Sequence, residues 1–231
     1  MKPALWGALL AAAAHPAMAQ APVRSANFYV TPYYDSGHSP FSNTRKVAVG
    51  ATFDGLLASS NPADILKARD IIVAKPDLIT PMTMMVLYAR LYDTGRRDEA
   101  VYWFYVAKDR FVTLMDVIDL QGSNLGQVSA AMTSFNQLLG PVINGYAFCS
   151  IANQQAIRKR AFDYARAHPY QAIFMQQLRA RKPGDRKAAL DRANAQIADG
   201  MGKETAYLVK NAASFMAQRK QNRMDAQYCW K

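Results

Sequence analysis

The stretch from Leu87 to Val112 constrains the fold more than any other part of the sequence, because its pattern indicates two helices joined by a short turn. Gly95 supplies the left-handed residue that commonly ends a helix. After the turn, apolar residues recur at helical spacing, and the other sides of the second helix are also largely apolar. A helix that is apolar on most sides lies buried between neighbours. The stretch therefore predicts an antiparallel helical hairpin at the centre of an all-α fold.

Local signals mark the ends of this hairpin. Thr80 is a favourable N-cap and Pro81 a favourable first residue for the first helix. Asp98 and Glu99 occupy the first turn of the second helix, where the helix dipole stabilises negative charge. We expect the second helix to continue to about Ile118.

The hairpin resembles a tetratricopeptide-type repeat, and its second helix also resembles the Sel1-like repeat. The residues that carry the resemblance are Leu87, Leu91, Gly95, Ala100, Trp103, Phe104 and Ala107. Tyr88 and Val112 depart from the tetratricopeptide pattern, and the sequence has no second copy of the repeat. The resemblance covers about residues 81–112 and implies repeat-like packing of two helices. The alternative is an ordinary helical hairpin inside a core.

The sequence before residue 61 differs in character from the sequence after it. Aromatic and turn-forming residues predict that residues 20–60 form a short, irregular or extended arm that packs on the helical body. Residues 61–231 predict one helical domain, in which about seven or eight helices pack as antiparallel hairpins around the tetratricopeptide-like pair. Asn61 and Pro62 form the N-cap and first turn of its first helix.

Glycine and proline residues set the expected boundaries of the later helices. We expect Gly140 and Pro141 to end one helix sharply. Gly200 and Gly202 predict a break within residues 186–220, because each interior glycine costs about 1 kcal/mol relative to alanine. The other expected elements are helices over 125–139, 151–167 and 170–180, and a short apolar element over 142–148.

Residues 1–19 have the pattern of a secretory signal peptide. Lys2 supplies the positive end, an alanine-rich apolar core follows, and Ala17 and Ala19 place small residues where a signal peptidase cuts, before Gln20. The apolar run is too short to span a bilayer, and the mature chain has no longer one, so we expect no transmembrane segment there. The pattern predicts an exported protein of a bacterial periplasm, with an extracellular location as the alternative.

Two cysteines are present, Cys149 and Cys229. In an exported protein two cysteines most often form one disulfide. This one would close a loop of about 80 residues, which stabilises a folded chain by about 4–5 kcal/mol on chain-entropy grounds. A metal site or a reactive thiol is the alternative, and two cysteines without a neighbouring histidine make a poor metal site.

The positive charge is concentrated in the last third of the chain. Residues 20–150 hold 11 basic and 11 acidic residues, whereas residues 151–231 hold 16 basic and 6 acidic residues. Two basic clusters stand out there, and aromatic residues such as Phe162, Tyr164, Tyr170 and Phe174 are interspersed with them. The clusters consist of Arg158, Lys159 and Arg160, and of Arg179, Arg181, Lys182, Arg186 and Lys187.

These clusters favour a docking surface for an acidic protein partner. One alternative is that the clusters only form a solvated helical face without a partner. Another is that they bind an anionic envelope surface. Export argues against nucleic acid as the partner, although a basic cluster in a cytoplasmic protein would suggest it first.

The sequence offers few groups for catalysis. His38 lies in a turn-rich loop with Asp35, Ser36 and Ser39, but a Ser-His-Asp site needs partners brought from separate elements. His168 is interpreted as a positive charge at the C-terminal end of a helix.

Asp116 and Asp119 lie three residues apart, so they could share a helix face for acid–base work or metal binding; a solvated face is the alternative. The sequence contains no Walker loop, dinucleotide-binding fingerprint, GxSxG, HExxH or CxxC motif. We therefore expect no cofactor, no metal and no enzymatic activity.

Together these features predict an exported, non-enzymatic protein-binding module. An immunity or inhibitor protein against an envelope-acting toxin is one form of this hypothesis. An envelope adaptor or scaffold protein is the alternative, and so is a hydrolase whose site the sequence does not reveal.

The cleavage site can be checked directly. We expect the protein recovered from the envelope fraction to begin at Gln20, because small residues stand at the two positions before the cut that the peptidase recognises. N-terminal sequencing measures this, and a cytoplasmic protein that retains Met1 would contradict export.

Overall fold

The computed structural model describes residues 49–121 and 125–230. Within them the chain forms eight α-helices and one short 3₁₀ helix, and the expected all-α fold is confirmed. The elements are α1 (Ala51–Ala58), α2 (Pro62–Ala74), α3 (Pro81–Asp93), α4 (Arg97–Val117), α5 (Gly126–Ala147), α6 (Ile151–Ala167), η2 (Gln171–Phe174), α7 (Arg186–Gln221) and α8 (Met224–Tyr228). The expected signal peptide and most of the expected arm lie outside the described residues.

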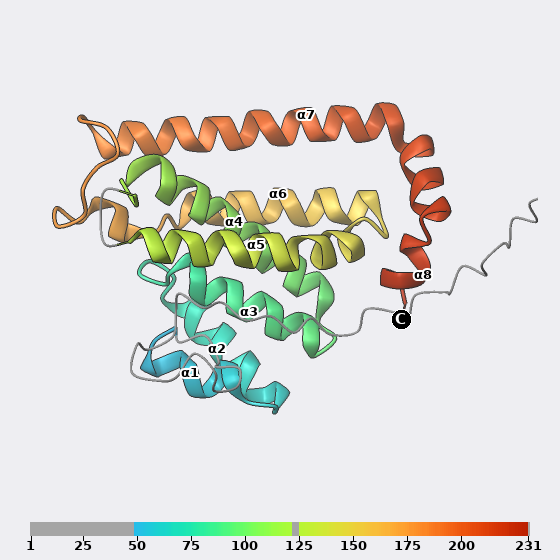
Figure 1. Cartoon of the computed structure of the whole chain (residues 1–231), viewed down its shortest axis with the longest axis horizontal. Helices are drawn as coiled ribbons and strands as arrows, with labels where there is room; N and C mark the ends of the chain where they lie inside the picture. Colours follow the sequence, from blue (N-terminus) through green and yellow to red (C-terminus); the bar gives the residue numbers. More distant parts are fainter. Residues whose placement is uncertain (1–48, 122–124, 231) are drawn as a thin grey trace, which may run out of the picture.

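The helices form a stack in which neighbours along the chain pack together and several alternate helices also touch. The pairs α1–α2, α3–α4 and α4–α5 are sequential, whereas α1–α3, α3–α5 and α4–α6 skip one helix. Figure 1 shows α1 and α2 at one end of this stack and α7 along the opposite side. In the middle lies α4, which contacts α3, α5, α6 and α7.

The position of α4 follows from its sequence. Ala100 and Ala107 are fully buried, which lets the helices beside them approach closely. Around them Phe104, Phe111 and Leu114 complete the buried face that the sequence predicts. The hairpin α3–α4 is therefore a structural core, and neither Ala100 nor Ala107 is open to a ligand.

The predicted local signals at the helix starts are confirmed. The side chain of Asn61 accepts a hydrogen bond from the first turn of α2, and that of Thr80 accepts one from the first turn of α3. Gly95 has a φ of 81°, which is the left-handed conformation expected between α3 and α4. The expectation that residues 51–58 belong to an extended arm is wrong, because they form α1, which buries Phe53 and Leu57 on the core.

Two predicted helix breaks are wrong because tertiary packing outweighs the local penalty. Pro141 lies inside α5, and beyond it Ile143 and Ala147 continue the buried face of the helix. Across its two glycines α7 is likewise continuous, and it buries Leu190 before them and Leu208 after them. Burying a leucine side chain contributes about 1.5–3 kcal/mol, which offsets the cost of an interior glycine.

The expected helix over 170–180 is also wrong. Only Gln171–Phe174 are helical, as η2, and turns follow. The reason is Arg186, whose guanidinium donates to the main-chain carbonyls of Ile173 and Met175 at 2.8 and 2.6 Å and also to that of Leu178. These carbonyls are held by Arg186, and that of Met175 also accepts from the N–H of Leu178 at 3.1 Å, which closes a single turn and not a continuing helix.

Two consecutive charged residues of the central helix are buried and hold other elements against it. Asp109 is 3% exposed and accepts two hydrogen bonds from Arg158 of α6, at 2.6 and 2.8 Å. Burial raises the pKa of the Asp109 carboxyl, even though both hydrogen bonds from Arg158 favour its charged form. The expectation that Arg158 belongs to a docking surface is therefore wrong, because this carboxylate holds it in the core.

The next residue, Arg110, is 1% exposed. Its guanidinium donates to the carbonyls of Pro76 and Ile79, at 2.8 and 3.1 Å, and to that of His168. Burial lowers its pKa to about 10. Arg110 thus fastens the α2–α3 loop and the end of α6 to the same point on α4.

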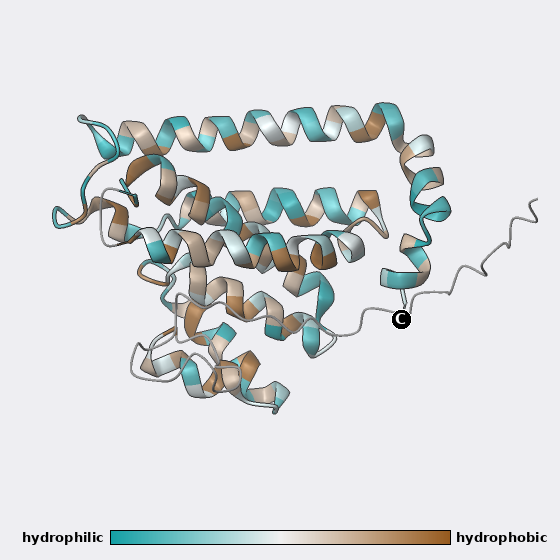
Figure 2. Ribbon diagram, viewed as in Figure 1, coloured by the Kyte–Doolittle hydropathy of each residue, from teal (hydrophilic) through white to brown (hydrophobic). Residues whose placement is uncertain are grey.

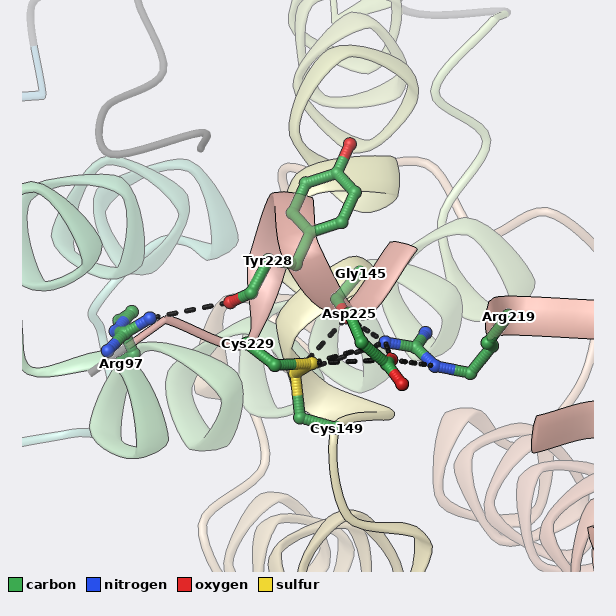
Figure 3. A network of polar contacts seen from close by, with 7 residues as sticks. All are labelled: Arg97, Gly145, Cys149, Arg219, Asp225, Tyr228 and Cys229. Carbon is green, nitrogen blue, oxygen red and sulfur yellow. Dashed lines mark hydrogen bonds and ion pairs between the residues drawn. A yellow bond between two sulfur atoms is a disulfide. The ribbon is translucent and has the colours of Figure 1, made fainter. Parts of the chain in front are cut away.

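The C-terminal segment is attached to the body by a disulfide and two arginines (Figure 3). The predicted Cys149–Cys229 bond is confirmed, with the two Cα atoms 5.6 Å apart. Beside it, Arg219 of α7 donates to the carbonyl of Gly145 at 2.9 Å and pairs with Asp225 of α8 at 3.0 Å. These contacts join the end of α5 to the end of α7 and to α8.

Gly145 and Arg97 complete this attachment. A Cβ atom on Gly145 would lie 2.7 Å from the ring of Tyr228, so only glycine allows α8 to pack this closely on α5. From the start of α4, Arg97 donates to the carbonyl of Trp230 at 2.6 Å. Its guanidinium also lies 4.5 and 3.9 Å from the ring centroids of Tyr146 and Trp230.

Replacing Arg158 by methionine tests the buried pair. We expect the free energy of unfolding to fall by about 3–5 kcal/mol, because Asp109 would remain buried without its cation. Urea denaturation at neutral pH measures this. The matched control is Lys159→Met on the same helix, since Lys159 is 74% exposed and pairs with Asp163 at the surface. We expect the control to change stability by less than about 0.5 kcal/mol, and equal effects of the two changes would contradict the assignment.

Candidate protein-binding surface

The described residues contain neither a membrane-spanning helix nor a cluster of metal-binding side chains. None of their helices is long and apolar enough to cross a membrane. Over the same residues no three His, Cys, Asp or Glu side chains gather in a group that could hold a metal ion. The features that remain as candidate sites are grooves and charged side chains that form no ion pair among the described residues.

Asp116 and Asp119 do not form a shared carboxylate site. Helix α4 ends at Val117, so Asp119 lies beyond it. Each carboxylate has its own arginine, since Arg181 lies 3.4 Å from Asp116 and Arg179 lies 3.4 Å from Asp119. The interpretation of these two residues as a joint catalytic or metal pair is wrong.

The two histidines considered from the sequence have different outcomes. His168 is the C-cap residue of α6, and its ring lies against Tyr164 with centroids 4.7 Å apart. This place at the helix end agrees with its interpretation from the sequence. His38 and its neighbouring Asp35, Ser36 and Ser39 lie outside the described residues.

The eight basic residues predicted to contact a partner do not form one surface. Arg158 is in the core, and Arg186 binds three main-chain carbonyls. Lys159 and Lys187 each pair with an aspartate one helical turn along their own helices. Much of the positive charge in the last third is thus neutralised or used structurally.

Of the remaining four, three lie on the loop before α7 and one lies on α6. Arg179 and Arg181 are exposed but pair with the aspartates at the end of α4, and Lys182 is exposed nearby. Arg160 of α6 is exposed, and its guanidinium lies 5.5 Å from the ring centroid of Tyr102.

One hollow lies between α6, η2 and the first half of α7, and is called the α6–α7 groove below. Its volume is about 540 Å³. Its apolar lining comes from Phe162, Pro169, Phe174, Leu190, Ala195 and Ala198, and its polar lining from Arg166, Gln171, Lys187, Asp191 and Asn194. Figure 2 shows hydrophilic and hydrophobic residues interspersed along α7.

The α6–α7 groove carries one cation that has no carboxylate partner among the described residues. Lys187 pairs with Asp191 at 2.6 Å across one turn of α7. Arg166 instead lies over the ring of Phe162, with the guanidinium carbon 5.8 Å from the centroid. Phe162 and Arg166 are four residues apart, so the sequence did contain the signal that places them together.

A second hollow lies on another side of α6, between α2, α4 and α6, and is called the α2–α4–α6 groove. Its volume is about 400 Å³. The buried Trp103 and Ile157 and the half-buried Tyr102 supply apolar lining. The remaining lining comes from Arg69, Val73, Arg96, Asp98, Glu99, Asn153 and Arg160. Sequence reasoning missed this groove because its walls come from three separate helices.

The carboxylates of the α2–α4–α6 groove are already occupied. Glu99 accepts hydrogen bonds from Arg69 at 2.8 Å and from Arg96 at 2.6 Å. Burial alone would raise the pKa of Glu99, but these two arginines outweigh it and hold the pKa below its ordinary value. Asp98 accepts from the hydroxyl of Tyr146 at 2.9 Å and from the amide of Asn153 at 3.0 Å.

Comparison with other proteins identifies a relative but no function. No family model and no solved structure matches the chain, so the resemblance to a tetratricopeptide-type repeat stays a prediction. Over 211 residues the chain is 32% identical to an uncharacterized protein of Haemophilus influenzae. The match covers 90% of this chain and 80% of that protein. The chain therefore belongs to the same family as this Haemophilus influenzae protein.

Proposed function

We propose that the protein is an exported, periplasmic and non-enzymatic protein-binding module that contacts its partner through the α6–α7 groove. The observation that carries the proposal is the combination of an apolar lining with Arg166, a cation that pairs with no carboxylate among the described residues. Apolar side chains of a partner would cover Phe162 and Phe174, and a partner carboxylate would pair with Arg166.

The lining of this groove favours binding over hydrolysis. Its one carboxylate, Asp191, is held by Lys187, and the lining contains no serine, cysteine or histidine that could act as a nucleophile or general base. An apolar floor with a charged edge is the arrangement in which a partner gains affinity from buried area and specificity from the edge.

The charge of the last third supports an acidic partner. Residues 151–231 contribute +10 of the net +11 of the chain. Opposite charges raise the rate of encounter, and salt reduces this rate because screening shortens the range of the interaction to about 10 Å at 0.1 M. An immunity or inhibitor role against an envelope-acting toxin is the specific form of the proposal, and an envelope adaptor is its alternative.

A photo-crosslinking amino acid placed at Ala195 tests the proposal in cells that make the protein. Ala195 lines the α6–α7 groove and is exposed, so the change should not disturb the core. We expect one discrete adduct with an acidic envelope protein, identified by mass spectrometry. The control position is Val209, which is 74% exposed on the same helix and lies outside the groove, and should give no such adduct.

Charge reversal then assigns the contact. Arg166→Glu should remove the Ala195 adduct, because the partner carboxylate would meet a like charge, whereas Lys159→Glu on the outer side of α6 should leave it. The proposal is wrong if Ala195 and Val209 give the same adducts, or if Arg166→Glu leaves the Ala195 adduct at its full yield.

A further inference from the structure

We infer that the α2–α4–α6 groove is a second docking site, separate from the α6–α7 groove, for an acidic peptide segment of a protein partner. Arg160 would bind a carboxylate of the segment, and an apolar side chain beside that carboxylate would cover Tyr102 and Val73. This site does not depend on the function proposed for the α6–α7 groove.

The charges of the groove point to an anionic ligand. Glu99 is shared by Arg69 and Arg96, and one oxygen of Asp98 accepts two hydrogen bonds. Arg160 has no ion pair with any described residue, and its one contact of this kind is the ring of Tyr102. The cation that remains available in this groove is therefore a guanidinium.

The contact between Arg160 and Tyr102 prepares that guanidinium for binding. Stacking on a ring leaves the N–H groups at the guanidinium edge free, and these are the groups that form paired hydrogen bonds with a carboxylate. Tyr102 is itself fixed, because its ring packs edge-to-face on Trp103 and on Tyr164 with centroids 5.4 and 6.0 Å apart. Less side-chain freedom is then lost when a ligand binds.

An apolar contact lies beside this cation. Val73, near the end of α2, is 51% exposed although it lines the groove. Tyr102 is half-buried and lines the same groove, with its ring 5.5 Å from the guanidinium of Arg160. A segment with an acidic residue next to an aliphatic or aromatic one would match both features.

The walls of the groove are fixed before a ligand arrives. The Arg69–Glu99 ion pair, at 2.8 Å, ties α2 to α4, and the Arg158–Asp109 pair ties α6 to α4. A groove of about 400 Å³ with walls from three helices can admit a peptide segment, whereas a flat membrane surface could not enter it. A single available cation would also neutralise only one phosphate of a nucleic acid, whereas such binding usually rests on several.

Selection from a random peptide display library against the purified full chain tests the inference without a known partner. We expect enriched sequences to share an acidic residue next to an aliphatic or aromatic one. A synthetic peptide of the enriched sequence should bind the wild-type chain, with affinity measured by fluorescence anisotropy. Arg160→Glu should weaken this binding at least tenfold, and Arg160→Lys should weaken it less, because lysine keeps the charge but loses the paired hydrogen bonds.

Two controls separate this site from its surroundings. Lys159→Glu makes the same charge change on the adjacent residue, outside the groove, and should alter binding less than twofold. Arg166→Glu disables the α6–α7 groove and should also leave the peptide bound. Thermal melting should show that Arg160→Glu is as stable as wild type, because Arg160 is exposed.

The inference is overturned if no acidic sequence is enriched, or if the enriched peptide binds Arg160→Glu as tightly as wild type. Loss of binding in Arg166→Glu with retention in Arg160→Glu would also overturn it, since the peptide would then occupy the α6–α7 groove. Loss of peptide binding in Lys159→Glu to the same degree as in Arg160→Glu would mark a general cationic surface instead, and would count against the inference.

Discussion

The buried ion pair between Asp109 and Arg158 fixes the position of α6 against the central helix, and both candidate grooves depend on that position. Two charges in an apolar core are costly to desolvate, so such a pair contributes more to the choice of one arrangement than to net stability. Because Asp109 is 3% exposed, any rotation of α6 that withdrew Arg158 would leave a buried carboxylate without a partner. The adjacent Arg110 holds the end of α6 through the carbonyl of His168.

The places of Arg160 and Arg166 in the two candidate grooves follow from the orientation of α6 about its own axis. Successive helical residues point about 100° apart, so fixing Arg158 inward turns its neighbours Lys159 and Arg160 outward. Arg160 then lies in the α2–α4–α6 groove, and Arg166, six residues later, lies in the α6–α7 groove. Helix α6 therefore presents to each of two hollows an arginine that pairs with no carboxylate among the described residues, while its remaining arginine, Arg158, holds the helix in place.

Local features of the fold could be predicted from the sequence, and features that depend on distant parts of the chain could not. Asn61, Thr80 and Gly95 act within one helical turn, so their roles at helix ends were predictable. The disulfide was predictable because the chain has two cysteines and an expected export signal. Helix α5 continues through Pro141, and α7 continues through its glycines, because both pack against other helices. A rule based on neighbouring residues does not include this packing.

The same limit applies to the candidate site. The composition located the positive charge in the last third of the chain. It could not show that Arg158 is buried and Arg160 exposed, or reveal grooves whose walls come from separate helices.

A double-mutant cycle on Asp109 and Arg158 tests the central claim most directly. The free energies of unfolding of wild type, Asp109→Asn, Arg158→Gln and the double variant would be measured by chemical denaturation at neutral pH. The structure predicts that the double variant is more stable than the sum of the single effects implies, with a coupling energy of about 1–3 kcal/mol. Single effects that add within about 0.5 kcal/mol would contradict the account, because the two side chains would then not hold α6 on α4 as a pair.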